Sequence, residues 1–195
     1  MKRYIFFTCV YFILSIYSSI NAQVCFRYDE QETCSSYPIT DFLVNFPIPG
    51  IASQPERHLD LATNLGWLFE VDKRWAVGPA FFFSSYLNGG WNSQLGVYLR
   101  IRHYLTKDLH LDVSPGLIIW NSPLPKGFAG YSSELAIGFG DWISLTSRFD
   151  YIRAYPEGNI EVFQIGVKFG SYAGLGLSGL ATVIGGIYYF LSRID

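Results

Sequence analysis

Apolar and polar side chains alternate with a period of two along most of the chain from residue 58 onward. In residues 58–71 the large apolar side chains occupy mainly the odd positions, and most even positions hold small or polar residues. Because successive side chains of a strand point to opposite faces, this period predicts β-strands with one apolar and one polar face. The same split recurs in residues 76–84, 94–102, 109–120, 134–139, 144–151 and 163–169.

Alternation alone does not decide the solvent, because a soluble barrel of the lipocalin kind also alternates, with its apolar face inward. Here the polar face mixes charges with Gly and Ala, which suits a narrow lumen. Tight connections at 72–74, 106–108 and 140–141 alternate with generally longer ones, as in membrane barrels. Aromatic residues that suit the membrane interfaces stand at strand ends: Trp75, Trp91, Trp120, Trp142, Tyr104 and Tyr155. We therefore expect the apolar faces to meet lipid.

The connection lengths also predict an eighth strand before the others. If the turn at Asp72 is periplasmic, the strand from His58 runs inward from the cell exterior, so an earlier strand must carry the chain out. Residues 39–47 alternate in the required way, and Pro47 and Pro49 would end the strand. The fold class is then all-β, an eight-stranded antiparallel up-and-down transmembrane barrel over residues 39–170.

The eight-strand meander, the charged lumen and the alternating connections resemble the small bacterial outer-membrane barrels of the OmpA and OmpX kind. Residues 163–169, whose alternating apolar side chains close on Phe169, resemble the C-terminal strand of those barrels. The resemblance covers about residues 39–170, concerns architecture only, and transfers no functional residue. It implies a location in the bacterial outer membrane. The chain departs from the pattern by continuing beyond Phe169.

The N-terminus predicts export. Lys2 and Arg3 precede a short apolar run, and a small residue, Ala22, stands at the expected cleavage point, so residues 1–22 are interpreted as a secretory signal peptide. The alternative is a retained anchor helix, for which the run is short. The mature chain would begin with a segment at 23–38 in which Cys25 and Cys34 form a disulfide, because an even cysteine count in an oxidising compartment favours pairing.

The C-terminal residues 171–195 carry no charge until Arg193. Apolar residues recur there at helical spacing, and four small residues stand four apart: Gly174, Ser178, Thr182 and Gly186. A line of small residues opposite a line of apolar residues predicts a C-terminal apolar helix. We expect this helix to pack against the barrel or at its periplasmic rim, where another envelope protein could dock. A further strand is the alternative.

The predicted register brings opposite charges together inside the barrel. A tight turn at Lys107 places Arg102 opposite Asp112, and one at Asp141 places Glu134 opposite Arg148. We expect a luminal charge network that Asp60, Glu70 and His110 extend, formed by Arg100, Arg102, Asp112, Glu134, Arg148, Asp150 and Lys168. Because an eight-stranded barrel is just wide enough for its own side chains, a filled lumen is favoured over an open pore.

No catalytic residues, metal site or cofactor emerge from the sequence. The net charge of −2, without a basic cluster, argues against nucleic acid as a partner, and no phosphate loop, zinc spacing or nucleotide fingerprint is present. His103 faces outward near a rim, but its expected neighbours, Leu111 and Ala76, cannot activate it. We therefore expect a non-enzymatic barrel with membrane lipid as its surroundings. The alternatives are a lipid-modifying enzyme using His103 and a rim serine, and a narrow gated pore.

Overall fold

The chain folds into one closed antiparallel β-barrel. The computed structural model describes residues 36–48, 59–87, 91–122, 130–154 and 158–170, together with 174, 176, 177 and 179. Every strand pairs with its neighbours in sequence, and β8 returns to pair with β1. The strands are β1 (Ser36–Pro47), β2 (Asp60–Asp72), β3 (Trp75–Leu87), β4 (Trp91–Tyr104), β5 (Leu109–Asn121), β6 (Gly130–Phe139), β7 (Ile143–Ala154) and β8 (Gly158–Gly170). The predicted eight-stranded antiparallel meander is confirmed.

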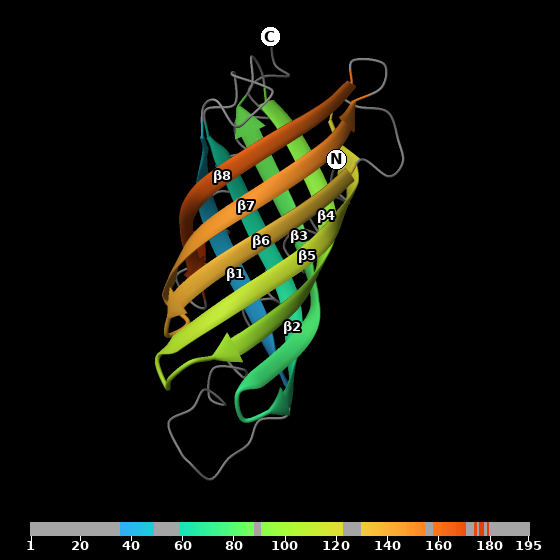
Figure 1. Ribbon diagram of the computed structural model, residues 1–195. Coiled ribbons are helices and arrows are strands. Elements are labelled where there is room, and N and C mark those ends of the chain that lie inside the picture. Colours follow the sequence, from blue (N-terminus) through green and yellow to red (C-terminus); the bar gives the residue numbers. More distant parts are fainter. Residues whose placement is uncertain are drawn as a thin grey trace, which may run out of the picture.

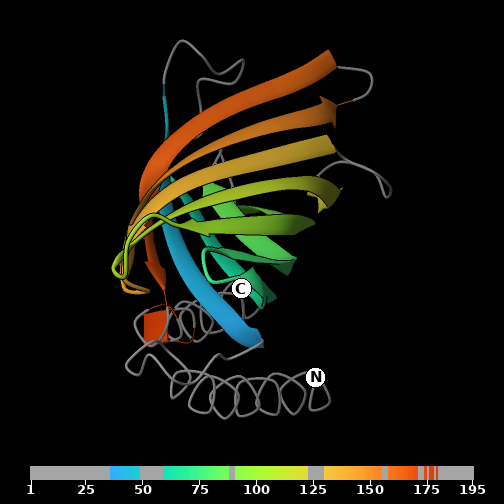
Figure 2. The ribbon, with the colours of Figure 1, turned by 60° about the horizontal axis from the view of Figure 1, so that its bottom comes forward.

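The strands run obliquely around the barrel, so that β4 to β8 curve over β1 to β3 and enclose a lumen (Figures 1 and 2). The connections at residues 73–74, 105–108 and 140–142 lie together at the lower end in Figure 1. We call this the short-turn end, and the other the opposite end. The tight connections predicted from the sequence therefore share one rim of the barrel.

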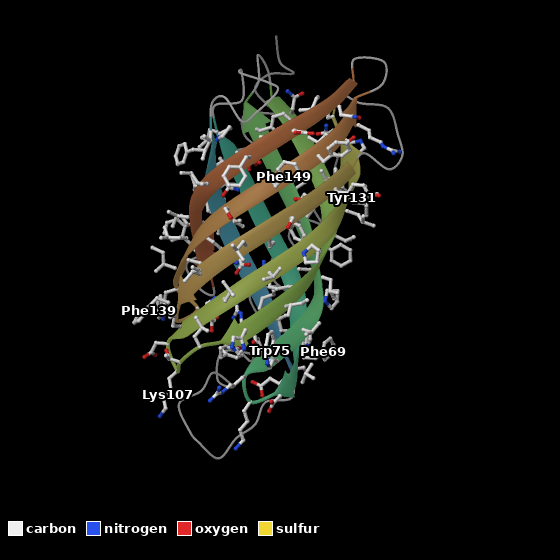
Figure 3. The ribbon with its side chains drawn as sticks, viewed as in Figure 1. Phe69, Trp75, Lys107, Tyr131, Phe139 and Phe149 are labelled. Atoms are coloured by element: carbon white, nitrogen blue, oxygen red, sulfur yellow. The ribbon has the colours of Figure 1, made fainter. Side chains whose placement is uncertain are left out.

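The two faces of the barrel wall carry different chemistry. Along β6 burial alternates strictly: Tyr131, Leu135 and Ile137 are exposed on the outside, whereas Ser132 and Glu134 are buried in the lumen. Outward aromatic side chains surround the barrel at several heights, among them Phe69, Trp75, Phe139 and Phe149 (Figure 3). Apolar groups thus face outward and charges inward, which is the reverse of a soluble barrel with an apolar interior.

One irregularity changes which residues face inward. The β4–β5 register shifts between Leu95 and Gly96, which pair with Trp120 and Ile118. Ile119 is the extra residue, so Ile119 and Trp120 are both exposed, and Asn121 is buried in the lumen. Such a bulge places two residues of one strand opposite one of the other and reverses the faces beyond it. Period-two alternation therefore ends at Ile118.

The barrel begins earlier than the sequence suggested, at Ser36 instead of residue 39, because Tyr37 also points inward and is buried. The predicted signal peptide at 1–22 and the predicted Cys25–Cys34 disulfide lie outside the described residues, as does most of the predicted C-terminal helix at 171–195. In the tail, Gly174, Gly176, Leu177 and Gly179 have helical backbone. No helix within the described part of the chain is long and apolar enough to span a membrane.

Candidate functional site

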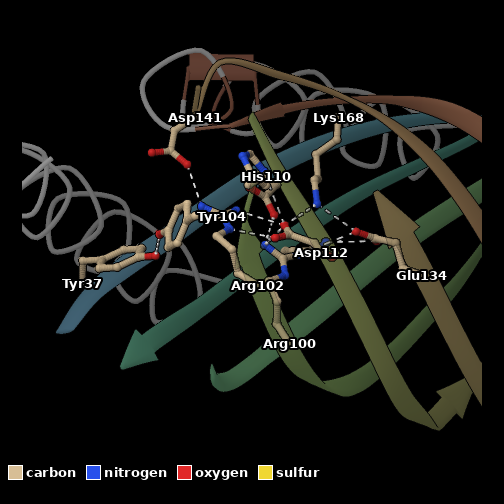
Figure 4. A network of polar contacts seen from close by, with 11 residues as sticks. Tyr37, Arg100, Arg102, Tyr104, His110, Asp112, Glu134, Asp141 and Lys168 are labelled. Carbon is tan, nitrogen blue, oxygen red and sulfur yellow. Dashed lines mark hydrogen bonds and ion pairs between the residues drawn. The ribbon is translucent and has the colours of Figure 1, made fainter. Parts of the chain in front are cut away.

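The lumen is filled by layers of side chains, beginning with an aromatic layer at the short-turn end. Tyr37 on β1 and Tyr104 on β4 are buried, and their hydroxyl groups are joined by a hydrogen bond across the lumen (Figure 4). Leu68 and Ile39 are buried in the same apolar cluster. This layer lies beside the contact by which Arg102 reaches Asp141 in the β6–β7 turn.

Asp112 on β5 is the centre of the first charged layer. Arg102 on β4 binds it with two parallel hydrogen bonds, Nε to Oδ1 at 2.7 Å and Nη2 to Oδ2 at 2.9 Å. Lys168 on β8 donates to Oδ2 from 3.2 Å, and Arg100 Nη1 lies 4.0 Å from the same oxygen. A carboxylate surrounded in this way accepts charge-assisted bonds from two strands, β4 and β8, which lie on different sides of the lumen (Figure 4).

Further carboxylates complete this layer. Glu134 lies 3.1 Å from Lys168 Nζ and 3.7 Å from Arg100 Nη2, and Asp41 lies 2.5 Å from Arg100 Nη1. At the short-turn end Arg102 reaches Asp141 at 2.7 Å, and burial raises the pKa of the Asp141 carboxyl although the Arg102 charge opposes the shift. We call this the turn-side cluster: Asp41, Arg100, Arg102, Asp112, Glu134, Asp141 and Lys168. Its three cations face four carboxylates, so its charges nearly balance.

An aromatic slab lies in the middle of the barrel. Phe82 on β3 stacks on Tyr98 on β4 with ring centroids 4.5 Å apart, and the Arg148 guanidinium lies 4.7 Å from the centre of the Phe82 ring. Glycines make room for these rings, since a Cβ on Gly96 would stand 2.3 Å from Phe82, and one on Gly116 would stand 2.3 Å from Tyr98. These glycines of the inner face therefore accommodate aromatic rings that lean over them from the neighbouring strand.

A second charged layer lies on the other side of this slab. Arg148 on β7 donates to Asp150 at 2.9 Å and to the Gln94 side chain at 3.0 Å, and lies 3.8 Å from Asp60. Gln164 donates to Asp60 at 3.0 Å, and Ser132 donates to Asp150 at 2.5 Å. We call this the loop-side cluster: Asp60, Gln94, Ser132, Arg148, Asp150 and Gln164. All its members are buried and are linked by hydrogen bonds and ion pairs to one another, whereas Gln94 Nε2 and Gln164 Oε1 make no hydrogen bond within the described residues.

The structure brings some of the sequence-predicted residues together and separates others. Arg102 and Asp112 are cross-strand partners and form an ion pair. Glu134 and Arg148 are also cross-strand partners, yet their charges belong to different clusters, with Glu134 facing Lys168 and Arg148 facing Asp150. Register predicts neighbours along the wall, but not how far a long side chain leans across the lumen.

Sequence reasoning missed several members of these clusters. Asp41 stands on the polar face of the first strand and would have been found by extending the network to every luminal carboxylate. Asp141 occupies a turn, where no alternation indicates its direction. Tyr98 and Gln94 are neutral, so a search for opposite charges on facing strands does not identify them. Each of them contacts an ionised side chain or its hydrogen-bonded partner.

His103 lies among aromatic groups on the outer face. Its ring centroid is 4.1 Å from that of Trp75, and its cross-strand neighbours are Trp75 and Leu111. Ala76 was the expected neighbour, but directly opposed residues share a face and Ala76 points inward, opposite Arg102. Within the described residues His103 Nδ1 makes no hydrogen bond, and no group of three His, Cys, Asp or Glu side chains could hold a metal ion.

No family model and no curated protein matches the sequence. Among solved structures, the Yersinia pestis outer membrane protein Ail in a phospholipid bilayer nanodisc is 9% identical, with 68% of this chain and 97% of that chain covered and a TM-score of 0.41. The crystal structure of Ail is 9% identical over 71% and 99%, with a TM-score of 0.37. A de novo designed transmembrane β-barrel is 9% identical over 71% and 98%, with a TM-score of 0.40.

Proposed function

We propose that this chain is a bacterial outer-membrane β-barrel whose lumen is a structural core, and that it serves the envelope through its wall and rims, without catalysis. One observation carries the proposal: charged side chains are buried along the axis while large apolar side chains face outward. Outward residues such as Phe81, Phe139 and Leu145 are more than half exposed. A continuous apolar surface of this kind is matched by acyl chains and is unfavourable in water.

Closure of the wall supports the membrane location. A β-structure can cross the hydrocarbon core only when no strand edge is left unpaired, because each free backbone group costs several kcal/mol there. In this chain β8 pairs with β1 over Asp41–Pro47, which removes the two edges that an open sheet would have. The predicted signal peptide is consistent with export to that membrane.

The filling of the lumen supports a structural role over a pore. Arg100, Arg148 and Phe82 are among the largest fully buried side chains of the described residues. Arg100 on β4 reaches Asp41 on β1, and Arg148 on β7 reaches Gln94 on β4. The two clusters and the slab between them occupy successive heights. Ions would have to displace paired charges to pass.

Single-channel recording on the purified barrel in a planar bilayer tests this function. The wild-type chain should show no steady conductance, and neither should Arg153→Ala, which changes an exposed outward arginine. The paired substitution Arg100→Ala with Arg148→Ala serves as the opened control. Steady conductance of the wild-type barrel would refute the filled lumen, and an altered cellular lipid profile in His103→Ala cells would refute the non-catalytic role.

A further inference from the structure

The outer face of β1 is covered at Thr40 and Phe42, whereas Phe46 on the same face is 53% exposed. Phe42 points outward, because its neighbours Asp41 and Leu43 point into the lumen, yet it is only 8% exposed. Exposed outward phenylalanines range from 40% at Phe149 to 63% at Phe139. Thr40 lies on the same face, two residues before Phe42, and is also 8% exposed.

Neighbouring strands do not account for this burial. The cross-strand partners of Phe42 are Thr63 on β2, which is small, and Phe169 on β8. The β1–β8 pairing reaches only as far as Asp41 opposite Gly170, so Thr40 lies where β1 extends beyond the end of β8. The group that covers this face must therefore come from outside the eight strands.

Gly174 shows where the chain goes after β8. It is buried, and a Cβ added to it would lie 2.3 Å from the carbonyl oxygen of Phe169, 2.9 Å from that of Thr40 and 3.2 Å from the Cα of Asp41. The chain therefore returns to the edge of β1 four residues after leaving β8. A backbone approach this close excludes any side chain at position 174.

We propose that residues 171–195 lie along the outer face of β1, beginning at the Gly174 contact, and shield Thr40 and Phe42 from lipid. The segment leaves the barrel beside this face, and it carries no charged side chain before Arg193, so it suits a position between the wall and the acyl chains. Small residues at the contact permit close packing in a membrane, where dispersion and fit drive association.

The position of this contact gives it a role in closure. The β1–β8 seam is where the first and last strands must find each other, and Phe42 and Phe169 face outward across it. A segment packed over the seam holds both strands without altering the lumen. The proposal is independent of whether the barrel conducts ions or acts on lipid.

Photocrosslinking of the full-length chain in phospholipid vesicles tests the proposal. Phe42 is replaced by p-benzoylphenylalanine, which keeps the aromatic ring, and Phe149 is replaced in the same way as a lipid-facing control. After irradiation and proteolysis, crosslinks from position 42 should map to peptides of residues 171–195, and those from position 149 to lipid. Crosslinks from position 42 to lipid, to a second copy or to residues before Ser36 would refute it.

A matched pair of glycine variants checks the contact itself. Gly174→Leu should abolish the crosslink from position 42 to the tail, because position 174 has no space for a side chain. Gly176→Leu should leave the crosslink intact, because nothing lies within 4 Å of a Cβ there. Equal crosslinking in the two variants would refute the assigned contact, even if the barrel itself folds normally.

Discussion

At the scale of single residues, Asp112 has three cationic side chains, Arg100, Arg102 and Lys168, within 4.0 Å of its carboxylate. It accepts two bonds from Arg102 and one from Lys168, and it is fully buried. Asp112→Asn leaves these cations without their shared counterion, and breaking a buried pair in this way costs about 3 to 5 kcal/mol. We expect a fall of that size in the free energy of unfolding, measured by urea titration of tryptophan fluorescence in phospholipid vesicles.

The matched control for this change is Asp108→Asn. Asp108 lies in the exposed connection between β4 and β5, so the same chemical change should alter the unfolding free energy by less than about 0.5 kcal/mol. Equal effects of the two variants would mean that the turn-side cluster contributes nothing to stability. In that case Asp112 would have to be explained by another role.

Residue pairs also show what the sequence could and could not predict. The Arg102–Asp112 contact follows from a turn and a period of two, since both residues lie on adjacent strands close to that turn. The Lys168–Asp112 contact does not, because it joins β8 to β5 across the lumen. Its existence depends on strand tilt and on the length of the lysine side chain, and neither is encoded in local alternation.

Among the elements, the strands form the most predictable part of the molecule. Alternation identified them because one face meets an apolar environment and the other a polar one, and this difference repeats every second residue. The exceptions have physical causes: the bulge at Ile119 inverts the faces, and β1 is covered on both sides at Thr40 and Phe42. A strand buried on both faces loses the contrast on which the prediction depends.

Depth along a strand should decide the cost of an outward charge. Phe81 and Phe139 are both outward and similarly exposed, at 61% and 63%, but Phe81 is central in β3 whereas Phe139 ends β6 at the short-turn end. An arginine at the bilayer midplane costs about 2 to 4 kcal/mol, and one near the interface about 0 to 1. We expect Phe81→Arg to reduce the unfolding free energy far more than Phe139→Arg in vesicles.

This pair of variants also tests the membrane assignment. The reduction should be smaller in a detergent micelle, where the apolar layer deforms more easily than in a bilayer. If Phe81→Arg and Phe139→Arg reduce the unfolding free energy equally in vesicles, the cost of an outward charge does not depend on its position along the barrel axis. The outward apolar face would then have to meet something other than acyl chains.

At the scale of the whole molecule, closure is a single property to which all eight strands contribute. The luminal clusters join strands that are distant in sequence: Asp41 on β1 binds Arg100 on β4, and Lys168 on β8 reaches Asp112 on β5. These contacts form only when the wall is complete. The fold class could be predicted because each strand shows its own alternation of apolar and polar residues. The partners across the lumen cannot be predicted in this way, because they meet only when the barrel closes.

Proline substitution should show that closure is cooperative. Val44 lies in β1 with partners on both sides, Leu61 on β2 and Val167 on β8, so Val44→Pro removes a ladder hydrogen bond where no strand edge is free. Val71 lies at the end of β2, inside the register shift between Glu70 and Asp72, where it has no cross-strand partner among the described residues, so Val71→Pro should be tolerated. A closed barrel resists detergent until it is heated, so unheated samples of the wild type and Val71→Pro should migrate differently from heated ones on a gel. Val44→Pro should show only the heated position; a preserved shift in that variant would mean that the β1–β8 seam is not required to hold the wall closed.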